Sequence, residues 1–282
     1  MRVRRRPRSP RQVSNGLLLL GLLLAGCGGP PRKAAPAEPQ ALTVYVPCLL
    51  SAPVQRVVEQ FQQTRPSASI SVMVDKPLAQ LAKLEAAGGS AAVAITFGEV
   101  EMRSLVAAGV VREDGAVDFA VNEHPLAVVA PAGTSGKRQS GLDELTSDRI
   151  QRIFIEDPSK STLGDRAEGA LKKLGLWDKV SGKVVRPAPD AMVLAELLAG
   201  KADAAVVIKG CLFAEKGKGG AIPKTIRVIG EIPSDAFPPI LHQAAPLGEP
   251  AGSELAQEFV DFLRSENGRE ALASAGLTPL KP

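Results

Sequence analysis

The sequence contains few of the residues, and none of the motifs, on which most enzymes depend. Its only histidines are His124 and His242. A Gly-x-Ser-x-Gly nucleophile elbow, a phosphate-binding loop ending in Gly-Lys-Ser/Thr and a His-Glu-x-x-His zinc motif are all absent. The acidic residues are spread over expected helix faces, where solvated carboxylates are usual, and no pair of them stands out. A cleft enzyme is therefore the least favoured class of function, because nothing nominates a nucleophile or a base.

Long hydrophobic runs are also absent, except near the N-terminus. There, six arginines precede an apolar segment, residues 17–24, which is too short to span a bilayer. The sequence Leu24-Ala25-Gly26-Cys27 follows and resembles the lipobox of bacterial lipoproteins. We therefore predict that residues 1–26 are a lipoprotein signal peptide and that Cys27 carries the lipid, which would anchor the protein to a bacterial membrane on its periplasmic or cell-surface face. An ordinary secretory signal or a simple membrane anchor is the alternative.

Positive charge becomes scarce once this leader is removed. The full chain has a formal net charge of +4, but residues 1–26 contain six arginines and no acidic residue, so the mature chain has a net charge of −2. Aromatic residues make up only 4% of the chain and do not cluster with basic ones. We therefore predict no nucleic-acid partner. Residues 27–40 are rich in Gly, Pro and Ala, a composition that suits a flexible tether.

Strand and helix patterns alternate through the rest of the chain. The first unit is a strand around Leu42 to Val46, a turn, and a helix that begins near Ser51, which we expect to be its N-cap. A turn from a strand into a helix N-terminus directs backbone N–H groups at one point, which is a common anion site. The βαβα order predicts an α/β fold with mostly parallel sheets flanked by helices.

The order of these motifs resembles the molybdate-binding protein of bacterial ABC importers, within the type II periplasmic solute-binding fold. The resemblance covers about residues 41–277. Beside the opening unit, it is carried by Leu84-Glu85-Ala86-Ala87-Gly88, Glu156-Asp157-Pro158, Gly175-Leu176-Trp177-Asp178-Lys179, Gly200-Lys201-Ala202-Asp203-Ala204 and Phe259-Val260-Asp261-Phe262-Leu263.

The resemblance implies two lobes with a ligand cleft between them, and a solute that lobe closure buries. Lobe I would comprise residues 41–123 and 240–282, and lobe II residues 124–239, with crossings near 122–126 and 238–242. The implied partners are a small oxyanion or other small solute and an ABC permease. A monomer without a cofactor is expected, and no enzymatic activity.

The residues that hold the oxyanion in this family do not carry over. Its first serine matches Leu49, its second serine matches Pro77 or Leu78, and its tyrosine matches Ile208. Backbone N–H groups near Cys48 and Leu49, and at Leu163 and Gly164, would remain to face the solute. Ser51, Thr162 or Lys76 could supply donors from displaced positions. Losing three hydroxyls, each bonded to a charged group, would cost several kcal/mol, or about three decades of affinity.

The two cysteines of the mature chain, Cys48 and Cys211, would border the cleft from opposite lobes in this family's geometry. Three interpretations stay open: two independent thiols, a disulfide that pins the lobes together, or a soft-metal site completed by His242 or Met192.

The sequence thus favours a lipid-anchored extracytoplasmic solute-binding protein, similar to molybdate-binding components of ABC transporters but with an altered ligand. The alternative is a cell-surface binding or scaffold module that has lost the small solute.

Overall fold

A computed structural model describes residues 40–87, 92–133, 141–212, 222–247 and 254–281. The predicted signal peptide (residues 1–26), Cys27 and nearly all of the expected tether (residues 27–40) lie outside the described residues. Within the ranges that the structure describes, no helix is both long enough and apolar enough to cross a membrane.

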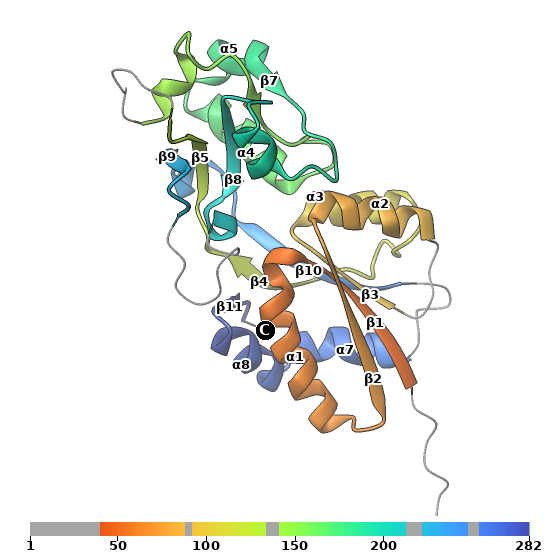
Figure 1. Cartoon of the computed structure of the whole chain (residues 1–282). Coiled ribbons are helices and arrows are strands. Elements are labelled where there is room, and N and C mark those ends of the chain that lie inside the picture. Colours follow the sequence, from red (N-terminus) through yellow and green to blue (C-terminus); the bar gives the residue numbers. More distant parts are fainter. Residues whose placement is uncertain (1–39, 88–91, 134–140, 213–221, 248–253, 282) are drawn as a thin grey trace, which may run out of the picture. The chain divides into compact units, whose positions relative to one another are not determined.

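Sheet A contains six strands (Figure 1). In spatial order they are β11 (Thr278–Pro279), β4 (Val117–Asn122), β10 (Ile240–Leu247), β3 (Ala92–Thr96), β1 (Gln40–Pro47) and β2 (Ala68–Asp75). In β1 every second side chain, Leu42, Val44 and Val46, is buried. This period of two is expected for a strand with one face on a hydrophobic core.

Helices cover both faces of sheet A. One face packs against α1 (Ser51–Thr64), α7 (Glu254–Arg264) and α8 (Glu266–Ser274), and the other against α2 (Pro77–Ala87) and α3 (Glu99–Ala107). The apolar side chains of α1 from Val54 to Phe61 are buried, and Phe61 lies edge-on to Phe259 and Phe262, with ring centroids 5.3 and 5.2 Å away. Burying a side chain of this kind stabilises the fold by about 1.5–3 kcal/mol.

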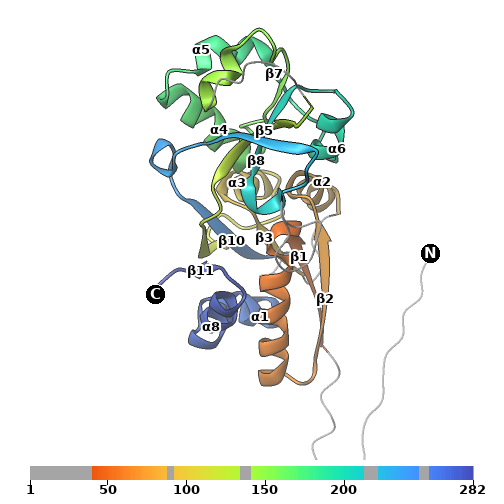
Figure 2. The same cartoon turned by 60° about the vertical axis from the view of Figure 1, so that its left-hand side comes forward.

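Sheet B contains five strands (Figure 2). Their spatial order is β7 (Val184–Val185), β6 (Ile153–Phe154), β8 (Ala204–Ile208), β5 (Leu126–Pro131) and β9 (Ile226–Glu231). The core on one face includes α4 (Thr162–Lys173) and α5 (Trp177–Val180), and the core on the other includes α6 (Val193–Leu198). Short 3₁₀ turns occur at Cys48–Leu50, Leu142–Thr146, Ser181–Lys183, Lys209–Leu212 and Ser234–Ala236.

The predicted α/β fold with two sheets flanked by helices is confirmed, and antiparallel strands join the parallel ones in both sheets. In sheet A, β2, β1 and β3 are parallel neighbours, whereas β10 pairs antiparallel with both β3 and β4, and β11 with β4. In sheet B, β5 is antiparallel to both β8 and β9. The antiparallel pairs arise because the chain leaves sheet A after β4, enters sheet B at β5, and returns from β9 to β10 in the centre of sheet A.

Candidate functional site

A cavity of about 300 Å³ lies where elements of sheets A and B meet. From the side of sheet A it is lined by the turn after β1, the start of α2 and the start of α3, namely by Cys48, Leu49, Lys76, Pro77, Leu78, Phe97 and Glu101. From the side of sheet B it is lined by Glu156, Leu163, Ala188, Pro189, residues 191–194, Val206, Val207, Ile208 and Cys211. The lining is thus supplied by segments far apart in the sequence.

The structure brings most of the sequence-predicted binding residues into this one cavity. Cys48, Leu49, Leu78, Leu163 and Ile208 all line it. These residues come from β1, α2, α4 and β8, or from the turns that follow them. The structure therefore gathers five of the six predicted binding residues around one space.

Gly164 is not among the lining residues of that cavity. It packs against the chain after β6 instead, where an added Cβ would lie 2.3 Å from the carbonyl oxygen of Glu156. Its N–H donates to the side chain of Ser161, the N-cap of α4, at 3.2 Å. The protein's own N-cap therefore already uses this donor.

The three side chains that could have replaced the lost hydroxyls are all engaged by the protein itself. Ser51 is the first residue of α1 rather than its N-cap, because a 3₁₀ turn leads into the helix, and its Oγ donates to the carbonyl of Cys48 at 2.8 Å. Thr162 Oγ1 donates to Glu101 at 2.5 Å. Lys76 Nζ donates to the backbone carbonyl of Asp190, opposite it at the cavity.

Two carboxyl groups line the cavity, which corrects the expectation that the acidic residues are solvated and unpaired. Glu101 is 2% exposed, and burial raises the pKa of its carboxyl to about 7. Glu156 Oε2 accepts a hydrogen bond from Ser161 Oγ, and burial raises the pKa of its carboxyl as well. The negative charge of the nearby Glu156 carboxylate raises the pKa of Glu101 further.

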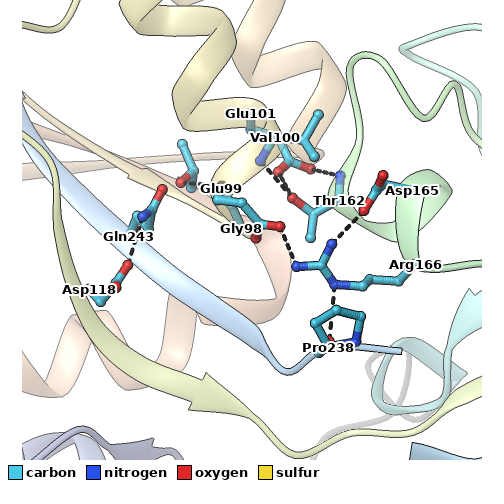
Figure 3. Close-up of polar contacts among 11 residues, drawn as sticks. Gly98, Glu99, Val100, Glu101, Asp118, Thr162, Asp165, Arg166, Pro238 and Gln243 are labelled. Atoms are coloured by element: carbon cyan, nitrogen blue, oxygen red, sulfur yellow. Dashed lines mark hydrogen bonds and ion pairs between the residues drawn. The ribbon is translucent and has the colours of Figure 1, made fainter. Parts of the chain in front are cut away.

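Glu101 connects the N-terminal turn of α3 with that of α4 (Figure 3). Its carboxylate accepts from both the backbone N–H of Thr162, at 3.0 Å, and the Thr162 hydroxyl, which in turn accepts from the N–H of Val100 at 3.0 Å. An added Cβ at Gly98 would lie 2.5 Å from the Thr162 side chain. The helix N-terminus that would face a bound anion in this turn is therefore occupied by an internal carboxylate.

Arg166 makes a second polar connection between these helices (Figure 3). Its guanidinium, 9% exposed, pairs with Glu99 of α3 and with Asp165 beside it on α4. Its Nε also donates to the carbonyl of Pro238, just before β10, at 3.0 Å. One side chain thus joins α3, α4 and a segment that returns to sheet A.

The structure places Cys48, Cys211 and Met192 at the same cavity but leaves His242 outside its lining, so the soft-metal interpretation stays a prediction. Cys48 and Cys211 both line the cavity as free thiols, so the structure holds them as two separate thiols rather than a disulfide. Burial raises the pKa of both, that of Cys211 to about 12. His242 lies elsewhere, fully buried, with Nδ1 2.8 Å from the carbonyl of Phe97. No group of three or more His, Cys, Asp or Glu side chains in the described ranges is placed to hold a metal ion.

A second cavity, of about 360 Å³, lies at the edge of sheet A against β4 and the C-terminal residues. Its lining, which includes Asp118, Arg264 and Lys281, comes from the sheet A side alone. A solute that is to be enclosed between two halves of a binding protein needs contacts to both. The cavity that elements of both sheets line is therefore the candidate site.

Comparison with known proteins agrees with this fold. Residues 42–278 match the family of bacterial extracellular solute-binding proteins, and the chain belongs to that family. The predicted resemblance to molybdate-binding proteins is confirmed, and the protein is a solute-binding protein rather than an enzyme.

The relatives are distant but cover nearly the whole chain. YvgL of Bacillus subtilis is 22% identical over 91% of this chain and 94% of its own, and the molybdate-binding protein ModA of Escherichia coli is 25% identical over 86% and 90%. The solved periplasmic molybdate-binding protein of Azotobacter vinelandii has a TM-score of 0.57 and 18% identity, covering 86% of this chain and 99% of its own. At this identity the structural likeness shows the fold alone.

Proposed function

We propose that this protein is the solute-binding component of an ABC importer, of the molybdate-binding type but with an altered ligand, and that its solute binds in the cavity between sheets A and B. The observation that carries the proposal is the cavity itself, which residues from both sheets line. The name of YvgL, which assigns that relative to the substrate-binding lipoproteins of ABC transporters, supports the same function.

The proposed mechanism is closure of two lobes around the solute. Lobe I comprises residues 41–123 and 240–282, lobe II residues 124–239, and the protein acts as a monomer that delivers the solute to a permease. The sheet topology supports this division, because the chain passes between the sheets at only two places in the described residues, after β4 and after β9. Short connections of this kind can serve as hinges.

A side chain that fills the cavity should abolish solute binding. Ala191 lines the cavity and is only partly buried, so Ala191→Trp should block the solute without disturbing the core. Ala195→Trp, on the exposed side of α6, is the matched control. Wild type and the control, purified from the native cells and then denatured, should release a small solute that mass spectrometry detects, whereas Ala191→Trp should release none.

Equal release by all three proteins would contradict this cavity as the site. The other candidate is a surface module that has lost its solute. It would be favoured if wild type and control release no solute and if no added solute raises their melting temperatures. The specific observation behind that candidate is Glu101, which lines the cavity and already accepts hydrogen bonds from the N–H and hydroxyl of Thr162.

We further propose that Cys27 carries the lipid that holds the mature protein at the membrane surface. Two or more acyl chains give stable membrane binding, because each buried CH₂ contributes about 0.8 kcal/mol. Mass spectrometry of the wild-type N-terminus should therefore find Cys27 as the first residue, with lipid attached to its sulfur, and Cys27→Ser should carry no lipid there. An unmodified Cys27 in wild type would contradict lipidation.

A further inference from the structure

We propose that the cavity binds a small organic cation, whose ammonium group meets the side chain of Glu156 and whose hydrocarbon body packs on the apolar walls. This inference rests on the proposed function and specifies the class of solute. It differs from the oxyanion that the resemblance to molybdate-binding proteins would imply.

The walls of the cavity are mostly hydrocarbon. Three leucines, Leu49, Leu78 and Leu163, line the cavity at positions where an oxyanion would need hydrogen-bond donors. Strand β8 adds two more apolar side chains, Val206 and Ile208. Among the described residues that line it, none carries a hydroxyl, an amide or a guanidinium. A dianion transferred into such a cavity would lose its water without gaining directed donors, which is strongly unfavourable.

Glu156 is the side chain with bonding capacity left for a solute. One of its carboxylate oxygens accepts from Ser161, and no other donor to this carboxylate occurs within the described part of the chain. Arg186 approaches the same residue, but its guanidinium donates to the Glu156 backbone carbonyl, at 2.7 Å, and to Glu168. A buried carboxylate without a cation is unfavourable, and a bound ammonium would supply both the missing charge and the missing donor.

The remaining charged groups at the cavity point the same way. Glu101 is the second carboxyl group, whereas Lys76 is the one cationic side chain in the lining and bonds to the Asp190 carbonyl. Cys48 and Cys211, the other titratable groups there, have raised pKa values and are neutral thiols at neutral pH. An anion would therefore face two carboxyl groups. No group of three His, Cys, Asp or Glu side chains in the described ranges is placed to hold a bare metal ion.

The test is a graded series of alkylammonium ions, each compared with the carboxylate and the alcohol of the same carbon skeleton, and with molybdate. Calorimetry on the mature protein at about pH 8 should show binding of the ammonium members, with weaker binding of the alcohols and none of the carboxylates or molybdate. Glu156→Gln should weaken ammonium binding by about 10- to 100-fold and leave alcohol binding nearly unchanged. Glu59→Gln, on the exposed face of α1, is the control and should bind as wild type does.

The pH dependence provides a second readout that does not need a variant. A cation binds best when Glu156 and Glu101 are ionised, and burial raises the pKa of both carboxyl groups. Ammonium binding should therefore strengthen from about pH 5 to about pH 8 and release protons, whereas binding of the alcohols should change little.

Tighter binding of the carboxylates or of molybdate would overturn the proposal, as would failure of every ammonium ion to bind. In either case the solute released from the native protein decides the wider question. If an anionic or neutral solute is released, the cation class is wrong and the solute-binding function stands. If nothing is released and nothing binds, both are wrong.

Discussion

Replacing Glu101 with glutamine should stabilise the protein increasingly as the pH rises, with a gain over wild type that grows by about 2–3 kcal/mol between about pH 5 and pH 8. The reason is that Glu101 is 2% exposed and its carboxyl pairs with no cation among the described residues, so burial raises its pKa from 4.5 to about 7. Between these two pKa values the folded state holds more protons than the unfolded state. Its stability therefore falls as the pH rises through that window, and a neutral amide does not share the loss.

The measurement is the free energy of unfolding by urea at several pH values, for Glu101→Gln, wild type and the exposed control Glu59→Gln. The difference between variant and wild type is needed because His242 acts with the opposite sign. Burial lowers the pKa of His242 from 6.5 to about 4, so its contribution to stability grows as the pH rises between those values. A difference between Glu101→Gln and wild type that does not change with pH would show that Glu101 is ionised without penalty.

Much of the fold could be predicted from the sequence because local patterns of apolar residues indicate which segments form strands and helices. The alternating burial of β1 and the apolar face of α1 were readable from Leu42, Val44 and Val54, Val57, Val58. The antiparallel strands were not readable, because the direction of a strand in a sheet depends on where the chain returns. Strand β10 lies in the centre of sheet A but follows all five strands of sheet B in the sequence.

The residues that gather around the candidate cavity could be predicted from the sequence, but the cavity's chemistry could not. Leu49, Leu78 and Ile208 could be placed by their order along the chain, and the cavity they line is the one observed. Glu101 was missed because one buried acid looks like any other helix acid in a sequence. A signal was present, since Glu101 stands one helical turn before the fully buried Leu105 and so shares its face. The hydrogen bond between Glu101 and Thr162 joins residues 61 positions apart, so no local sequence pattern predicts it.

Replacing Arg166 with methionine should destabilise the protein by about 2–4 kcal/mol and loosen the contact between α3 and α4. Methionine fills much of the same volume but makes none of the guanidinium's bonds to Glu99, Asp165 and the Pro238 carbonyl. The loss should stay below that of a fully buried ion pair, because Glu99 and Asp165 are 24% and 44% exposed and water can solvate them. Arg166→Lys should recover only part of it, because one ammonium cannot replace three separately directed N–H groups.

The matched control is Arg56→Met, which removes an exposed pair within α1 and should cost less than about 1 kcal/mol. Urea unfolding measures the stability, and hydrogen exchange at the amides of Val100 and Thr162 reports the contact itself, since both amides are bonded across it. If Arg166 joins the two helices, exchange at these two amides should accelerate more than the loss of global stability explains. Equal acceleration throughout the protein would mean that Arg166 only stabilises the fold. Faster exchange confined to these amides would show that Arg166 holds α3 against α4, a contact that would have to separate under the proposed movement of the lobes.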